Sequence, residues 1–345
     1  MSITHLSGSR KSMPMLHQRL VPVGSILHAR PAARRLLLVL ASAATLWAGP
    51  ARACSVCGCG DPLLSASDPA AIAGTLRLQL DVEYLRVDAG TDGVPGSTDQ
   101  LKQLSYRLNA VFRPLEALTL SATLPVVSKS ITAVGVGPAV VASDLNGLGD
   151  AEVSARFVPW RSVQVGARRA QELAVAAGSS LPTGAHDAKD AGALIDPHGQ
   201  LGAGAWGPFA GLHYRFEQGD WTGYAGLSWR HRAEARYFDG SRYKFGDALL
   251  WSVHGQVLLA RRVALDLGVD GRDARPDRAV ADDGTVTAAV ENTGGVVWSL
   301  APGVYVDTVA GIWLFVRAQV PIIKRLDGEQ DVKPSVTVGV QFLPW

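Results

Sequence analysis

The chain has only three cysteines among its 345 residues, Cys54, Cys57 and Cys59. An iron–sulfur cluster or a structural zinc site takes four protein ligands, so three thiols are too few for either. Covalent haem attachment uses the motif C-x-x-C-H, and Gly58 stands where the histidine would be. These absences exclude the most familiar cofactors of a cysteine-rich segment.

Long apolar runs and basic patches are also missing from most of the chain. Between residues 54 and 345 no run of 18 apolar residues occurs, which excludes a membrane-spanning helix there. The first 53 residues hold seven of the basic side chains, which leaves 26 basic against 31 acidic residues in the remainder, a net charge of −5. We therefore expect no nucleic-acid partner.

Acidic residues are absent from the first 53 positions, and this segment has the order of a secretory signal peptide. Basic residues ending at Arg35 precede the short apolar run LLLVLASAATLWA, and the A-x-A sequence of residues 51–53 follows. We predict that residues 1–53 are a signal peptide, that cleavage follows Ala53, and that Cys54 becomes the new N-terminus.

The rest of the sequence has the period-two pattern of β-strands. In residues 75–87, Leu76, Leu78 and Leu80 fall on one face, whereas Arg77 and Gln79 fall on the other. Most of the segments that repeat this pattern have the length of tilted membrane strands, about 9–11 residues, rather than the 5–6 usual in soluble proteins. The twelve predicted strands are 75–87, 103–113, 117–127, 149–159, 171–181, 205–217, 221–232, 248–259, 262–272, 296–306, 311–320 and 334–343.

Short and long connections alternate between these strands, which is typical of outer-membrane barrels. We predict an all-β fold for residues 75–345: a transmembrane antiparallel up-and-down β-barrel of about twelve strands, with short periplasmic turns and long extracellular loops. Three prolines near predicted outer strand ends mark where we expect pairing to stop: Pro125, Pro182 and Pro321. The tryptophans form two girdles, with Trp160, Trp221, Trp313 and Trp345 at the periplasmic ends and Trp206, Trp229, Trp251 and Trp298 at the outer ends.

The polar face of the predicted strands carries charges of both signs, which we expect to face the lumen. They indicate either a polar path that selects solutes or a water-filled barrel braced by internal ion pairs, and the sequence leaves both open. The lumen-facing candidates are Arg77, Asp81, Glu83, Arg107, Glu152, Arg156, His213, Arg215, His254 and Arg317.

Two further groups of residues have the types used in active sites or metal sites. Ser252 and His254 share one strand face, but same-face neighbours lie about 7 Å apart, so we expect no enzyme activity from them. The sequence of residues 182–204 includes His186, Asp196 and His198, whose spacing fits no compact ligand set. We expect this segment to be an exposed, mobile loop.

Four stretches, SATLPVV, GLGDAEVSARF, SLPTG and WGPFAGLHYRF, resemble the outer-membrane transporters of the MetA-pathway-of-phenol-degradation family, which are distantly similar to fatty-acid channels. The resemblance covers about residues 70–345. It implies a barrel in the outer membrane of a Gram-negative bacterium, inserted into lipid by the barrel assembly machinery. It also implies a channel or transporter for small solutes, with hydrophobic solutes as a candidate class.

The cysteine-rich start is not part of that resemblance, and several roles for Cys54, Cys57 and Cys59 stay open. They are a disulfide or structural element in an oxidising compartment, a soft-metal site such as one for Cu(I), or lipidation of Cys54. We expect no other cofactor. Residues 54–74 are predicted to be a periplasmic segment and a candidate plug. The alternative function is therefore a closed or scaffold barrel whose N-terminus docks a periplasmic redox or metal-handling partner.

Overall fold

The computed structural model describes residues 76–342, apart from 92–93, 135–139, 191–192, 238–239, 260–261, 281–285 and 310. The predicted signal peptide, residues 54–74 with the three cysteines, and Trp345 therefore lie outside the described residues. Within the described part, no helix is both long and apolar enough to cross a membrane.

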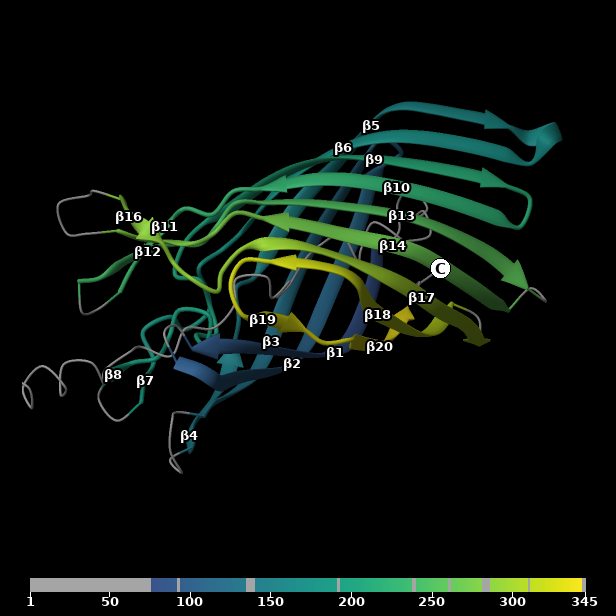
Figure 1. The fold of residues 1–345 in the computed structure, drawn as a ribbon. Helices are drawn as coiled ribbons and strands as arrows, with labels where there is room; N and C mark the ends of the chain where they lie inside the picture. The colour runs from purple at the N-terminus through teal and green to yellow at the C-terminus, as the bar shows by residue number, and fades with distance from the viewer. Residues whose placement is uncertain are drawn as a thin grey trace, which may run out of the picture. The chain divides into compact units, whose positions relative to one another are not determined.

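Twelve antiparallel strands pair in chain order and close into a barrel (Figure 1). Closure comes from β20, which pairs with β18 on one side and with β1 on the other, from Leu78 opposite Phe342 to Tyr84 opposite Val336. All twelve predicted strands are present, so the predicted fold class is confirmed. The barrel strands are β1 (Leu76–Thr91), β2 (Val94–Leu115), β3 (Leu118–Val134), β5 (Glu152–Gln164), β6 (Arg169–Ser180), β9 (Gly207–Gln218), β10 (Trp221–Arg230), β13 (Ala248–Leu259), β14 (Val263–Ala274), β17 (Gly295–Val309), β18 (Ile312–Leu326) and β20 (Ser335–Phe342).

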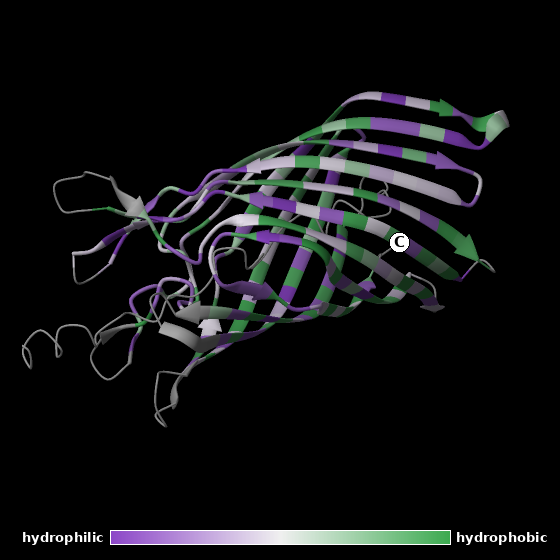
Figure 2. Ribbon diagram, in the orientation of Figure 1, coloured by the Kyte–Doolittle hydropathy of each residue, from purple (hydrophilic) through white to green (hydrophobic). Residues whose placement is uncertain are grey.

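Along these strands apolar and polar side chains alternate between the two faces of the sheet, which Figure 2 shows as bands of opposite hydropathy. In β1, Leu80 is 50% exposed on the outer face, whereas its neighbour Asp81 is 1% exposed on the inner face. In β2 the same contrast separates Leu108 from Arg107. Because successive strand residues point to opposite faces, the sequence alternation becomes an apolar exterior around a polar lumen.

Short turns join the strands at one end of the barrel. They include Glu116–Ala117, Gly219–Asp220 and the turn 165–168, where a 3-10 turn, η3 (Val165–Ala167), leads to Arg168 in the left-handed region with φ 48°. The segment between the predicted strands 149–159 and 171–181 is thus mostly strand, with a tight turn in its middle. We call the opposite end, where the long connections lie, the outer end.

The long connections carry short strands of their own. Residues 181–206, which we call the β6–β9 loop, contain a small hairpin, and four other connections contribute the rest. These short strands are β4 (Val140–Leu148), β7 (Lys189–Asp190), β8 (Ala193–Leu194), β11 (Glu234–Arg236), β12 (Arg242–Lys244), β15 (Arg278–Val280), β16 (Val286–Ala289) and β19 (Gln330–Val332). β11, β12, β15 and β16 pair into a separate four-stranded sheet.

Strand pairing continues past two of the prolines at which it was expected to stop, so that prediction is wrong for Pro125 and Pro321. At Pro125, β3 changes partner: it pairs with β5 as far as Thr123 and with β4 from Val126 onward. At Pro321 the β17–β18 register shifts, as in a β-bulge. Proline lacks an N–H, and a change of partner or a bulge accommodates that loss without ending the strand.

Candidate functional site

Arg107 joins two carboxylates of the adjacent strand on the lumen wall. Its Nε donates to Asp81 at 2.6 Å and one terminal nitrogen donates to Glu83 at 2.9 Å. Arg107 and Asp81 are direct partners in the β1–β2 register, and Asn109 donates to the second oxygen of Asp81 at 2.8 Å. All three side chains are buried, and the single guanidinium bonds both carboxylates along the wall.

A second group on the lumen wall centres on His254 of β13. Its Nδ1 lies 2.9 Å from Asp266 and its Nε2 lies 2.9 Å from Asp270, both on β14. The ring also stacks on Tyr224, whose hydroxyl donates to Asp266 at 2.8 Å. A Cβ at Gly268, the residue paired with His254, would lie 2.2 Å from the imidazole. The missing side chain at this position therefore makes room for the ring between the two carboxylates.

The same geometry bears on Ser252, which shares the lumen face with His254. Both ring nitrogens of His254 are engaged by carboxylates, so neither is aimed at Ser252 as a general base would be. Within the described ranges, Ser252 Oγ has no hydrogen-bond partner. The arrangement fits a wall-bound polar network and does not fit a nucleophile with its base.

The other predicted lumen residues are distributed along the inner face. Arg77, Glu152 and Arg317 are buried, whereas Arg156, His213 and Arg215 are partly exposed. Four of them form ion pairs: Arg156 with Glu172, Arg215 with Glu217, Glu152 with Arg230 and Arg317 with Asp270. The three cysteines are not placed, since they lie outside the described residues. Over the described ranges no group of three or more His, Cys, Asp or Glu side chains is arranged to hold a metal ion.

The β6–β9 loop was expected to be exposed, and that expectation is wrong for its second half. Ile195, His198 and Gln200 are 8%, 7% and 1% exposed. Lys129 of β3 donates through Nζ to the carbonyl oxygens of His198, at 2.9 Å, and of Gln200. The Gln200 amide bonds the backbone of Ala188 and Ile195. Because the buried backbone groups find partners, this polar segment can pack against the lumen wall.

Three outer loops meet around Asp277, which is fully buried. Tyr243 donates to one carboxylate oxygen at 2.6 Å, and the Gly246 amide donates to the other at 2.7 Å. His198 Nε2 lies 2.7 Å from the first of these oxygens. Burial, with Lys129 nearby, lowers the pKa of His198 to about 3, and burial raises the pKa of Asp277 to about 6. The imidazole is therefore neutral near pH 7.

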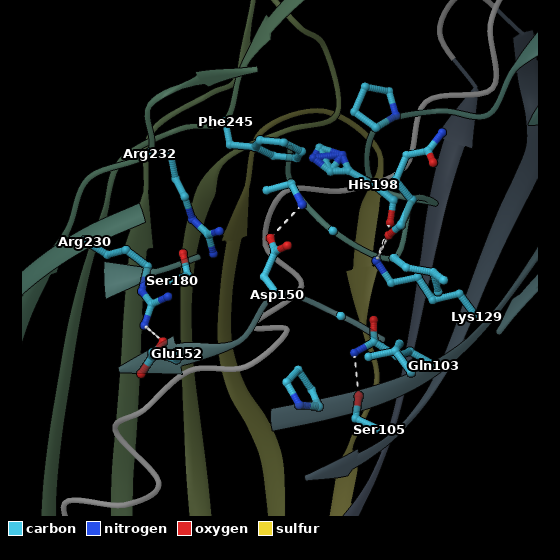
Figure 3. Close-up of a pocket in the computed structure, with 18 of the residues that line it drawn as sticks. Gln103, Ser105, Lys129, Asp150, Glu152, Ser180, His198, Arg230, Arg232 and Phe245 are labelled. Atoms are coloured by element: carbon cyan, nitrogen blue, oxygen red, sulfur yellow. Dashed lines mark hydrogen bonds and ion pairs between the residues drawn. The ribbon is translucent and has the colours of Figure 1, made fainter. Parts of the chain in front are cut away.

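A cavity of about 120 Å³ lies between this loop cluster and the lumen wall (Figure 3). The wall contributes Gln103, Lys129, Glu152 and Arg230, and the loops contribute groups such as Arg232. Asp150, between β4 and β5, accepts from the Ala203 amide at 2.7 Å and so ties the wall to the loop. The lining mixes charged and amide side chains with apolar groups such as Val127, Leu201 and Phe245.

Several residues of this outer cavity were absent from the sequence-based set. Lys129 follows the predicted end of its strand, yet Val127, Lys129 and Ile131 continue the inward-facing alternation of β3 and are buried. Carrying the period-two pattern past Pro125 would have placed Lys129 in the lumen. Asp277 lies in a loop, where no periodic signal exists. Arg232 falls within the predicted strand 221–232, in phase with Arg230, but in the structure it lies just beyond the end of β10.

Comparisons with known proteins bear on the fold. No protein-family model matches the sequence, and no curated protein matches it. Among solved structures, an outer membrane channel from Pseudomonas putida F1 is similar, with TM-score 0.60 and 14% identity over 80% of this chain and 99% of that chain. The expected likeness to outer-membrane channel barrels is thereby confirmed at the level of the fold.

Two further solved structures are similar at a lower level. The translocator domain of the autotransporter NalP from Neisseria meningitidis has TM-score 0.44 and 14% identity, over 81% of this chain and 92% of that chain. A Pseudomonas aeruginosa FadL homologue has TM-score 0.39 and 11% identity, over 78% and 90%. Similarities this low carry no argument about function.

Proposed function

We propose that the protein is an outer-membrane channel for small polar solutes in a Gram-negative bacterium. The observation that carries the proposal is a closed twelve-stranded barrel with an apolar exterior and a charged lumen. Side chains such as Leu80, Phe157 and Leu212, each about half exposed, would be costly in water and suit contact with lipid. A closed barrel leaves no sheet edge unpaired in the membrane. The similar fold of the Pseudomonas putida channel supports the same function.

The choice of polar solutes rests on the outer cavity. Its lining places Lys129, Asp150, Glu152 and Arg230 around the space that a solute would cross. A hydrophobic solute would remove water from these groups without replacing their hydrogen bonds. These charged groups make polar solutes the better fit, and the hydrophobic class implied by the sequence resemblance the poorer one.

Conductance of the purified, detergent-refolded protein in planar lipid bilayers tests the channel proposal. Stepwise current at low protein concentration is expected. A barrel that stays silent, both as residues 54–345 and with residues 54–74 deleted, would contradict channel function and favour the scaffold alternative. Fractionation is a second test, because extraction into buffer without detergent would rule out an outer-membrane barrel.

The N-terminal region completes the proposal. Residues 1–53 act as a signal peptide removed after Ala53, and the cysteines then lie in an oxidising periplasm. Intact mass of the exported protein gives the cleavage site. Counting thiols that alkylate before and after reduction separates a disulfide from free cysteines. If all three alkylate without reduction and no metal co-purifies, both the disulfide and the stable-metal roles are wrong.

A further inference from the structure

We infer that the outer cavity is a binding site for a small organic anion, such as a short mono- or dicarboxylate. The inference deepens the proposed channel function, on which its biological role rests, by naming a solute class. The site lies where the β6–β9 loop, pinned to the wall by Lys129, narrows the outer end of the lumen.

The charge of the lining is the first argument. Arg107 also lines the cavity, but it is balanced by Asp81 and Glu83 on the wall. The remaining charges are four cations against three carboxylates, and Arg230 pairs with Glu152 at 2.7 Å. The cations are Lys129, Arg230, Arg232 and Arg272, and the carboxylates are Asp150, Glu152 and Asp277.

The way the carboxylates are held is the second argument. Asp150 accepts from the backbone amides of Gly184, at 3.0 Å, and Ala203, at 2.7 Å. Asp277 is fully buried beneath the loops and accepts from Tyr243 and Gly246. Donors of the backbone and of Tyr243 thus already occupy both oxygens of each carboxylate, which leaves the two carboxylates poorly placed to bind a cationic solute.

Lys129 supplies the third argument. It is 7% exposed, and it donates to two carbonyl oxygens, which carry no net charge. The field of its buried ammonium acts on the adjacent space, where it also reaches Asp150. Together with Arg232 and Arg272 it makes the cavity a favourable place for a carboxylate, which guanidinium groups bind in a bidentate manner.

The size of the cavity limits the ligand. A water molecule needs about 10–15 Å³ of such volume, so 120 Å³ holds on the order of ten water-sized groups. A four-carbon dicarboxylate fits this space, whereas a folded peptide or an oligosaccharide does not.

Three probes of equal chain length and different charge test the inference by titration calorimetry on the detergent-solubilised protein. They are succinate, 1,4-butanediol and 1,4-diaminobutane. We expect succinate to bind most tightly and to weaken as salt screens the site. Equal or tighter binding of the diamine, or binding of succinate no tighter than that of the diol, would overturn the inference.

Variants locate the site. R232Q/R272Q is expected to lower succinate affinity about tenfold, whereas R232K/R272K, which keeps both charges, retains most of it. The matched control is R168Q, an exposed arginine at the opposite end of the barrel, which should bind like the wild type. Heat-dependent gel mobility and circular dichroism confirm that each variant is folded. Unchanged affinity in folded R232Q/R272Q would place any binding elsewhere.

These binding measurements do not depend on conductance, so the anion site and the channel function can each be contradicted without the other. A conducting barrel that binds no succinate keeps the channel function and loses the anion site. A silent barrel that binds succinate, with loss in R232Q/R272Q, keeps the anion site and loses the channel function.

Discussion

In the middle of the lumen, charged side chains are held by neighbours on adjacent strands, whereas at the outer end they are held by loop residues distant in the chain. Asp81 and Arg107 face each other in one hairpin, and His254 bonds Asp266 twelve residues away. Lys129, by contrast, bonds the carbonyl of His198, which is 69 residues away. The first kind of contact forms when a hairpin forms, and the second requires a loop to dock. We therefore expect the wall network to last until global unfolding and the outer contacts to open earlier.

The largest expected effect comes from breaking the wall network at Arg107. R107A leaves Asp81 and Glu83 without their cation, at 1% and 7% exposure, and should lower the free energy of unfolding by about 3 kcal/mol. Denaturant unfolding in lipid vesicles measures this. The control R168A removes an exposed pair with Asp220 and should cost less than about 1 kcal/mol. Equal costs for the two variants would show that the wall charges are well solvated.

A backbone position tests the second wall group. G268A places a Cβ against the ring of His254 and should displace it from Asp266 and Asp270, at a cost of about 2 kcal/mol. The control is G255A on β13, where an added Cβ meets no atom within 4 Å. The same unfolding assay compares them. A G268A variant as stable as G255A would mean that His254 moves without loss.

At the outer end, K129M removes the bonds that pin the β6–β9 loop. We expect a local effect of about 1.5 kcal/mol, seen as faster hydrogen exchange at residues 195–205, with little change in global unfolding. If the barrel conducts, its mean conductance should rise. K324M, at an exposed lysine paired with Asp331, is the control. A drop in global stability as large as that of R107A would remove the distinction between the two regions.

The smallest expected effect concerns the pH dependence of hydrogen-exchange protection in the loops around Asp277. Its sign should change when His198 is replaced. The pKa of His198 is lowered to about 3, so the open loop binds more protons between about pH 6.5 and 3, and loop protection falls as pH falls. Asp277, with its pKa raised to about 6, acts oppositely: its contribution is present below about pH 4 and is lost as pH rises through 6. Between about pH 6 and 4 the two contributions nearly cancel in the wild type, and the wider shift of His198 leaves only a small net fall in protection as pH falls.

Replacing the histidine isolates the opposing group. In H198Q only the Asp277 contribution remains, so protection of residues 195–205 should rise as pH falls from about 6 to 4, by less than about 1.4 kcal/mol per pH unit. Hydrogen exchange across that range gives the slope. A wild type and H198Q with slopes of the same sign would contradict the assignment.

The sequence pattern predicted some of the residues that face the lumen and missed others. Alternation predicted the inward face of β1 and β2, including Asp81 and Arg107, because strand geometry fixes which side chains share a face. It missed Lys129 because Pro125 was taken to end the strand, whereas β3 changes partner there. It misjudged His198 and Gln200 because a loop rich in Gly, Asp and Pro shows no periodicity that would indicate burial.

The sequence by itself determined the strands, their order, the apolar exterior and the charges that face the lumen, because each depends on a two-residue period and on neighbours in the chain. Only the tertiary structure decided that the β6–β9 loop enters the outer end and that Lys129, His198 and Asp277 meet beside one cavity. Those contacts join residues from separate connections. They form because buried polar groups need partners, and the closed barrel is what brings those partners within reach.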